Sequence, residues 1–92
     1  MSLKVLEQIA APRLLVLLAK RGKMSITELR SSLDASGMAI YNAIKKLSQA
    51  GLVNDEYEEH FPRRRLISLT EKGRRVAELL AQIEAVLEGS DR

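Results

Sequence analysis

Apolar side chains recur at helical spacing through most of the chain, and short polar breaks separate the repeats. They return every three or four residues in five segments, which predicts helices over residues 3–10, 12–20, 26–32, 37–50 and 71–87. The second segment is apolar on more than one side, so we expect it to be central and largely buried. Its ends also fit a helix, because Pro12 suits a first turn and Gly22 follows two basic residues.

Three of these segments follow residues that cap helices. Ser25 and Glu28 have the spacing of a capping box, in which each side chain accepts a hydrogen bond from the backbone N–H group of the other residue. Ser36 and Thr70 stand where N-caps are expected for the fourth and fifth segments. Gly51 suits the left-handed position that follows a helix. The helix ends are therefore predicted from local residues.

The period changes after residue 51. Residues 52–58 and 65–69 contain β-branched and aromatic residues in alternation, which predicts two strands joined as a hairpin by the proline-containing loop 59–64. Residues 23–24 could add a short strand. The predicted fold class is mainly α with a small β-hairpin: a winged helix-turn-helix with a three-helix core, a wing of two or three strands and a C-terminal dimerisation helix.

Length and composition restrict the classes of function. The 92 residues fit a single domain, 1–92, and the net charge of +3 permits a nucleic-acid partner without requiring one. The absence of cysteine excludes disulfides, thiolate metal sites and a cysteine nucleophile. The longest apolar run, residues 14–19, is far shorter than the roughly 20 residues that span a bilayer. We expect a cytoplasmic, nucleoid-associated protein with no membrane partner.

The segment 37–50 has the character of a DNA recognition helix. Ile40, Ile44 and Leu47 share one face, which must pack inward. The remaining faces suit a major groove, where asparagine can pair with adenine, small apolar groups touch the thymine methyl group, and lysines meet phosphates. The expected DNA contacts of this segment are Ser36, Met38, Ala39, Tyr41, Asn42, Lys45 and Lys46. An ordinary surface helix would have a similar composition.

The predicted hairpin loop concentrates positive charge. Arg63, Arg64 and Arg65 follow His60, and all four are candidate DNA contacts at a wing tip. A narrow minor groove has an enhanced negative potential that attracts arginine. The alternative is pairing with the acids of the opposite strand, Asp55, Glu56, Glu58 and Glu59. We expect these acids to neutralise part of the wing and the arginines at the tip to stay free.

Two short motifs resemble winged-helix transcription regulators of the MarR, PadR and ArsR type. Residues 36–53 (SGMAIYNAIKKLSQAGLV) look like the recognition helix and first wing strand, and residues 69–73 (LTEKG) look like the L-T-x-K-G segment that enters the last helix. The resemblance implies a homodimer that binds pseudo-palindromic operator DNA, usually as a repressor. It implies base or phosphate contacts for Ser36, Ala39, Tyr41, Asn42 and Lys45. The cysteine-containing metal motif of ArsR sensors is absent from residues 28–33.

The last predicted helix carries more apolar surface than one small domain needs. Its stripe follows alternating three- and four-residue steps with an extra flank. Part of it should pack on the core, and the rest predicts a two-fold dimer through residues 1–11 and 71–88. The expected interface residues are Leu3, Leu6, Ile9, Val76, Leu79, Leu80, Ile83, Val86 and Leu87. Alternatively, the whole stripe closes the core of the monomer.

No residue pattern indicates an enzyme. His60 is the only histidine and lies in a loop without an evident orienting partner, and the glycines are scattered turn residues, so we expect no catalytic group, metal or cofactor. The prediction is a sequence-specific, dimeric regulator of double-stranded DNA, with repression as the expected outcome. The alternatives are a winged-helix protein-interaction module or a non-specific architectural chromatin protein. A small-molecule effector is not indicated, and any such molecule would have to bind at the dimer interface.

Overall fold

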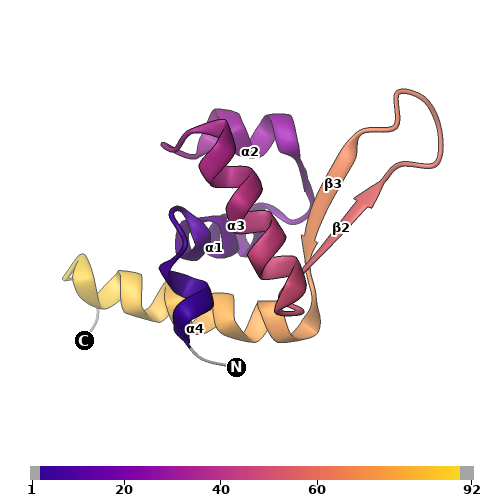
Figure 1. Cartoon of the computed structure of the whole chain (residues 1–92). Coiled ribbons are helices and arrows are strands. Elements are labelled where there is room, and N and C mark those ends of the chain that lie inside the picture. Colours follow the sequence, from indigo (N-terminus) through magenta and orange to yellow (C-terminus); the bar gives the residue numbers. More distant parts are fainter. Residues whose placement is uncertain (1–2, 90–92) are drawn as a thin grey trace.

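The computed structural model describes residues 3–89. Four α-helices, one 3-10 helix and a small sheet follow one another in the predicted order (Figure 1). The elements are η1 (Leu3–Glu7), α1 (Ala11–Arg21), β1 (Met24–Ser25), α2 (Ile26–Ser32), α3 (Gly37–Gln49), β2 (Val53–Tyr57), β3 (Arg65–Leu69) and α4 (Glu71–Leu87). The two ends of the expected domain, residues 1–2 and 90–92, lie outside the described residues.

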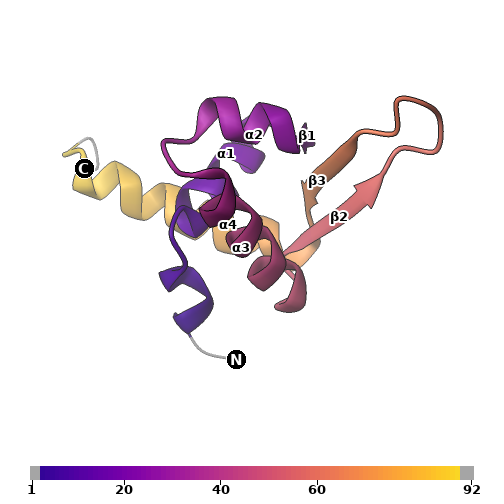
Figure 2. The same ribbon diagram turned by 45° about the horizontal axis from the view of Figure 1, so that its top comes forward.

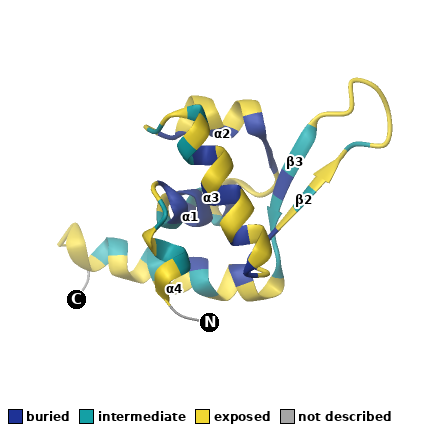
Figure 3. Ribbon diagram, viewed as in Figure 1, coloured by how far each residue is buried: buried dark blue, intermediate teal, exposed yellow. Residues whose placement is uncertain are grey.

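The core forms around α1, as predicted. Leu14, Leu15 and Leu18 are buried on different sides of this helix, which contacts η1, α3, α4 and β3. Figure 3 shows the buried positions on the sides of α1, α2 and α3 that face one another. The largest fully buried side chains are Leu14, Leu15, Leu18, Leu29, Ile40, Ile44, Leu47 and Ile67. This single cluster fixes the helices that carry the wing and the exposed face of α3.

The sheet has the order β1-β3-β2, and both pairs are antiparallel. Met24 pairs with Ile67, whose side chain is fully buried, so β1 attaches the sheet to the core. In the hairpin, Val53 pairs with Leu69 and Tyr57 with Arg65. The far end of this hairpin extends away from the helices in two views (Figures 1 and 2). The predicted wing is therefore three-stranded at its base and two-stranded beyond it.

The predicted caps are present. The Ser25 Oγ accepts from the N–H of Glu28 at 3.1 Å, and the Ser25 N–H donates to Glu28 Oε1 at 2.8 Å. The Ser36 Oγ accepts from the N–H of Ala39 at 3.1 Å, and the Thr70 Oγ1 accepts from the N–H of Gly73 at 2.9 Å. Each cap satisfies a backbone donor that lacks a partner inside its helix.

The N-terminal segment differs from the prediction of a helix over residues 3–10. It is a 3-10 helix that ends at Glu7. Ala10 has a φ of 70°, and this left-handed backbone conformation separates the segment from α1. Only Val5 and Leu6 of η1 pack against the core, whereas Leu3 and Ile9 are exposed. So little packing cannot support a longer helix, because short helices depend on tertiary contacts.

Candidate nucleic-acid interface

One face of α3 anchors the helix and the other faces are open. Ile40, Ala43, Ile44 and Leu47 are buried without exposed area, as the sequence predicts. The opposite side combines amide, hydroxyl, ammonium and apolar groups on one continuous helix. Its exposed members are Ser36, Met38, Tyr41, Asn42, Lys45 and Lys46, and Ala39 is half-buried beside them. The polar face is therefore not covered by the described part of the chain.

Ser36 holds the first turn of α3 while remaining exposed. Its hydroxyl oxygen accepts the N–H of Ala39 at 3.1 Å, and no protein group within residues 3–89 accepts its hydroxyl proton. A serine hydroxyl can accept and donate at the same time. The hydroxyl proton of Ser36 is therefore available to a ligand, and the positive end of the helix dipole at this turn favours an anion.

Arg30 is a cation near this helix start that the sequence reasoning missed. Its Nε lies 3.3 Å from the position that a Cβ would take on Gly37. Thr27, Arg30, Ser31, Ala35 and Gly37 line a shallow polar hollow of about 320 Å³ there. No linear motif signals the approach, because the turn between α2 and α3 brings Arg30 and Gly37 together.

Arg65 joins the wing to α3. Its Nε and one terminal nitrogen donate to the two carboxylate oxygens of Asp55 at 2.8 and 2.6 Å. Its guanidinium carbon lies 5.4 Å from the centre of the Tyr41 ring, within the range of a cation–π contact. The Asp55 carboxylate raises the pKa of Arg65. Arg65 is half-buried, so its side chain is occupied by the protein itself rather than free at the tip.

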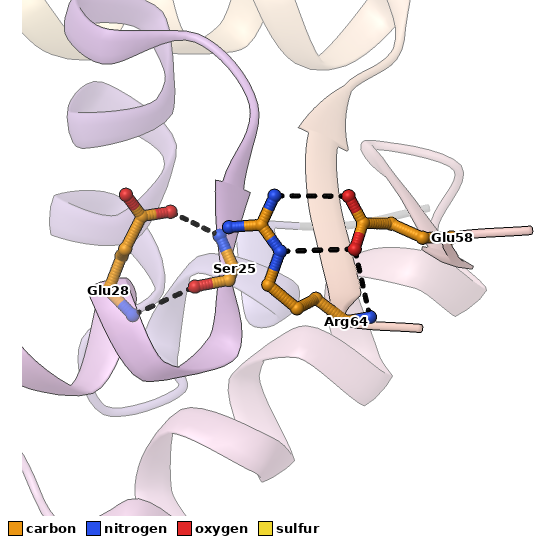
Figure 4. Close-up of polar contacts among 4 residues, drawn as sticks. All are labelled: Ser25, Glu28, Glu58 and Arg64. Carbon is orange, nitrogen blue, oxygen red and sulfur yellow. Dashed lines mark hydrogen bonds and ion pairs between the residues drawn. The ribbon is translucent and has the colours of Figure 1, made fainter. Parts of the chain in front are cut away.

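Arg64 is also held. Its backbone N–H and Nε donate to Glu58 Oε1 at 3.1 and 3.0 Å, and a terminal nitrogen donates to Glu58 Oε2 at 3.0 Å. Figure 4 shows its guanidinium between Glu58 and the Ser25–Glu28 capping box. The hydrogen bonds from Arg64 lower the pKa of Glu58, and those from Ser25 lower the pKa of Glu28. The expectation that acids neutralise part of the wing is confirmed.

The expectation that the arginines of the tip stay free is correct for one of them only. Arg64 and Arg65 are paired, because the hairpin register places them beside Glu58 and Asp55. Arg63 is exposed, has a φ of 52° and forms no ion pair within the described residues. His60 is exposed too, and its carbonyl accepts the N–H of Arg63 at 2.8 Å. Phe61, which the sequence reasoning passed over, is 93% exposed between them.

The expected dimer surface divides into two groups. Leu6, Val76 and Leu80 are half-buried and pack against the chain's own core. The others leave their side chains open to solvent: Leu3, Ile9, Leu79, Ile83, Val86 and Leu87. Between α1 and α4 lies a groove of about 180 Å³ with an apolar floor and a charged residue on each helix; it is lined by Pro12, Arg13, Val16, Leu80, Ile83, Glu84 and Leu87. The stripe of α4 therefore does not close the monomer core completely.

Within the described residues there is neither a metal-binding cluster nor a membrane-spanning helix. Within 3–89, no three histidine, aspartate or glutamate side chains gather closely enough to hold a metal ion. None of the helices in this range has the length and apolar character needed to cross a membrane.

Comparison with known proteins places the fold. A family model described as an ArnR1-like winged-helix domain matches residues 5–87. A transcriptional regulator homologue from Pyrococcus horikoshii OT3 has a TM-score of 0.78 at 21% identity, covering 97% of this chain and 90% of that chain. A protein of Enterococcus faecalis V583 assigned to the MarR family of transcriptional regulators has a TM-score of 0.81 at 22% identity, covering 95% and 79%.

A third solved structure is more similar in sequence. A double mutant of ZitR from Lactococcus lactis, in its apo form, has a TM-score of 0.78 at 27% identity, covering 88% of this chain and 61% of that chain. No curated protein sequence matches the chain. The winged-helix fold predicted from the recognition-helix and L-T-x-K-G motifs is confirmed.

Proposed function

We propose that this chain, which belongs to the ArnR1-like winged-helix family, is a regulator that binds double-stranded DNA in a sequence-specific manner. One observation carries the proposal: the polar side of α3 is exposed over its whole length, while its apolar side is locked in the core. In this role Asn42 reads base edges in the major groove, and Met38 and Ala39 contact thymine methyl groups. Tyr41 and the lysines flank these contacts.

Phosphate contacts would set the position of the helix on the duplex. Lys45 and Lys46 lie further along α3, and Ser36 and Arg30 lie at its start. Together they supply cations and N–H donors on both sides of the base-reading residues. Arg63 and His60 extend the contact through the wing, since their side chains are exposed and form no ion pair within residues 3–89.

We also propose a homodimer. The exposed apolar residues of α4 and the groove against α1 provide a surface that a second copy can cover. Two recognition helices would then meet half-sites about 34 Å apart, or a multiple of that. Repression is the outcome we favour, because a dimer bound across a promoter blocks access to it without further contacts. The site of action is the cytoplasmic nucleoid, and no enzymatic step is involved.

The test is a titration of labelled duplexes with Asn42→Ala and Arg63→Ala variants. Asn42→Ala should cost about 1–3 kcal/mol on the preferred sequence and relax specificity there, because a bidentate base contact is lost. Arg63→Ala should weaken binding to all duplexes and lower the salt slope by about one unit. Gln82→Ala, on the exposed side of α4, is the control. If neither variant weakens binding, the proposed surface is wrong.

A protein-interaction module is the second candidate. Glu56 and Glu59 stay exposed on the wing and would repel phosphate, which favours a basic protein partner. Wild-type protein that retards no duplex at low salt would support this function. Binding with no preference among competing duplexes would support an architectural role instead.

A further inference from the structure

The tip of the wing presents an aromatic ring with nothing to pack against. Phe61 is 93% exposed, although aromatic side chains bury large areas in ordinary packing. It sits in a tight turn closed by the hydrogen bond from the Arg63 N–H to the His60 carbonyl. Pro62 follows it, and a hollow of about 620 Å³ lies beside the turn. The wing thus ends in an exposed apolar ring on a hydrogen-bonded turn.

The arginines near the tip do not account for the exposed ring of Phe61. The guanidinium groups of Arg64 and Arg65 form ion pairs with Glu58 and Asp55, which lie closer to the helices than the tip does. Arg63 alone remains as an unpaired arginine of the described wing. The two ion pairs link the opposite sides of the hairpin below the turn and so stabilise the base of the tip. A loop that only presents arginine charge to DNA has no role for an exposed phenylalanine, so Phe61 calls for a separate function.

We infer that Phe61, backed by Pro62, is an apolar wedge that the wing inserts into the minor groove of duplex DNA, against or between base pairs. The inference rests on the proposed DNA-binding function and adds a contact to it. Phenylalanine and proline are among the residues that architectural proteins insert between base steps, where they unstack the bases and bend the duplex. Arg63 and His60 flank the ring and meet the phosphates on either side of the groove.

The orientation of the wing supports this assignment. Arg65, at the end of β3 nearest the tip, lies over the ring of Tyr41 on the exposed side of α3, so the outer part of the paired strands contacts that helix. A duplex that receives α3 in its major groove therefore meets the wing at a set angle. The tip projects beyond the helices (Figures 1 and 2), where it can cross the backbone to the neighbouring minor groove.

The experiment uses the full chain and a mixed-sequence duplex of about 30 base pairs, long enough for roughly three helical turns. Phe61→Ala should weaken binding by at least about fivefold, because stacking of an aromatic side chain on bases carries that much affinity. The salt slope should not change, since no charge is removed. Phe61→Leu should retain most of the affinity, because leucine also serves as a wedge. Arg63→Ala is the matched control, since it should lower the salt slope.

A second measurement reads the insertion directly. The chain contains no tryptophan, so Phe61→Trp places a single indole at the tip. Its fluorescence should be quenched when duplex is added, whereas the indole of Glu78→Trp, exposed on α4 beside the apolar stripe, should not respond. The wedge is wrong if wild type and Phe61→Ala bind the duplex with equal affinity and the fluorescence of Phe61→Trp is not quenched. That result would leave the DNA-binding proposal intact. A blue shift of the indole at high protein concentration without DNA would also overturn the wedge, because the ring would then dock on protein. Wild-type protein that binds no duplex would overturn both proposals.

Discussion

The carbonyl oxygen of Leu52 lies directly against Gly73, so that a Cβ atom on Gly73 would be 1.8 Å from it. The same carbonyl accepts the N–H of Thr70 at 3.1 Å, and the Thr70 hydroxyl donates to the Gly51 carbonyl at 2.6 Å. The start of α4 is therefore clamped to the turn that follows α3. This contact gives a physical reason for the threonine and the glycine of the L-T-x-K-G motif.

Gly73→Ala should therefore destabilise the fold by about 1–3 kcal/mol or more, because the new methyl group meets backbone that cannot give way easily. The matched control is Gly37→Ala, also in the first turn of a helix. There the new methyl group would meet only the flexible Arg30 side chain, at 3.3 Å. Urea unfolding of both variants gives the comparison. Equal stability of the two variants would contradict the clamp.

The Asp55–Arg65 pair should stabilise the wing rather than the whole domain. Both side chains are partly shielded, with 20% and 30% of their areas exposed, and the contact is bidentate. A double-mutant cycle with Asp55→Ala and Arg65→Ala should give a coupling energy of about 1 kcal/mol. Amide hydrogen exchange should quicken in β2 and β3 first. Glu56→Ala, on the same strand without an ion pair, should leave exchange unchanged; faster exchange there would point to general loosening.

Ser36 allows capping and DNA binding to be separated. Ser36→Asn and Ser36→Asp both keep a side-chain acceptor for the Ala39 N–H, so both should unfold at about the wild-type midpoint. The aspartate adds a negative charge where we place a phosphate, so DNA binding should fall for Ser36→Asp and much less for Ser36→Asn. Chemical denaturation and duplex titration measure the two effects. Equal binding by the two variants would remove Ser36 from the interface.

The acids that support the wing predict a dependence of stability on pH. The pKa of Glu58 in the folded chain lies below its ordinary value of 4.5, because Arg64 donates to its carboxylate. Because the pKa of Glu58 is lower in the folded chain, the Glu58–Arg64 contact contributes its full stabilisation of the fold above pH 4.5. That stabilisation is lost as the pH falls through the folded pKa. Glu58→Gln should therefore destabilise the wing at pH 7, and its difference from wild type should shrink as the pH falls through the folded pKa of Glu58.

Urea midpoints between pH 7 and pH 3 check this prediction. The gap between wild type and Glu58→Gln should narrow as the pH falls. Glu28→Gln should behave similarly, since Ser25 lowers the pKa of Glu28. Glu56→Gln, an exposed change without an ion pair, serves as the control. A gap that widens toward acid pH would show that Arg64 does not stabilise the ionised carboxylate.

Much of the fold could be predicted because its signals are local. The capping box of Ser25 and Glu28 and the N-caps at Ser36 and Thr70 each act within three residues, and they placed the helix starts correctly. Strand β3 also has the predicted bounds. The buried face of α3 followed from helical spacing alone, because its partner is the general apolar core and no particular side chain.

The sequence indicated the acids of the opposite strand as partners of the wing arginines, but it could not assign which arginine meets which acid. Arg63, Arg64 and Arg65 are neighbours in sequence, but the hairpin register decides that two of them meet acids and one does not. The approach of Arg30 to the start of α3 likewise depends on a turn whose geometry no motif records. Contacts between elements need the structure, whereas contacts within an element do not.

The proposed dimer makes a prediction that separates assembly from folding. Ile83 lines the apolar groove beside α1 and is 53% exposed, so Ile83→Lys removes little packing from the monomer. It should therefore keep the helical circular dichroism of the folded wild type but run as a monomer in size-exclusion chromatography with light scattering, and its unfolding midpoint should not depend on protein concentration. Duplex binding should weaken, because one recognition helix would then dock alone. Asn54→Lys adds the same charge at an exposed polar position on β2, away from the stripe of α4, and should remain dimeric. A wild-type protein that is itself monomeric while bound to DNA would show that the exposed stripe of α4 serves another partner.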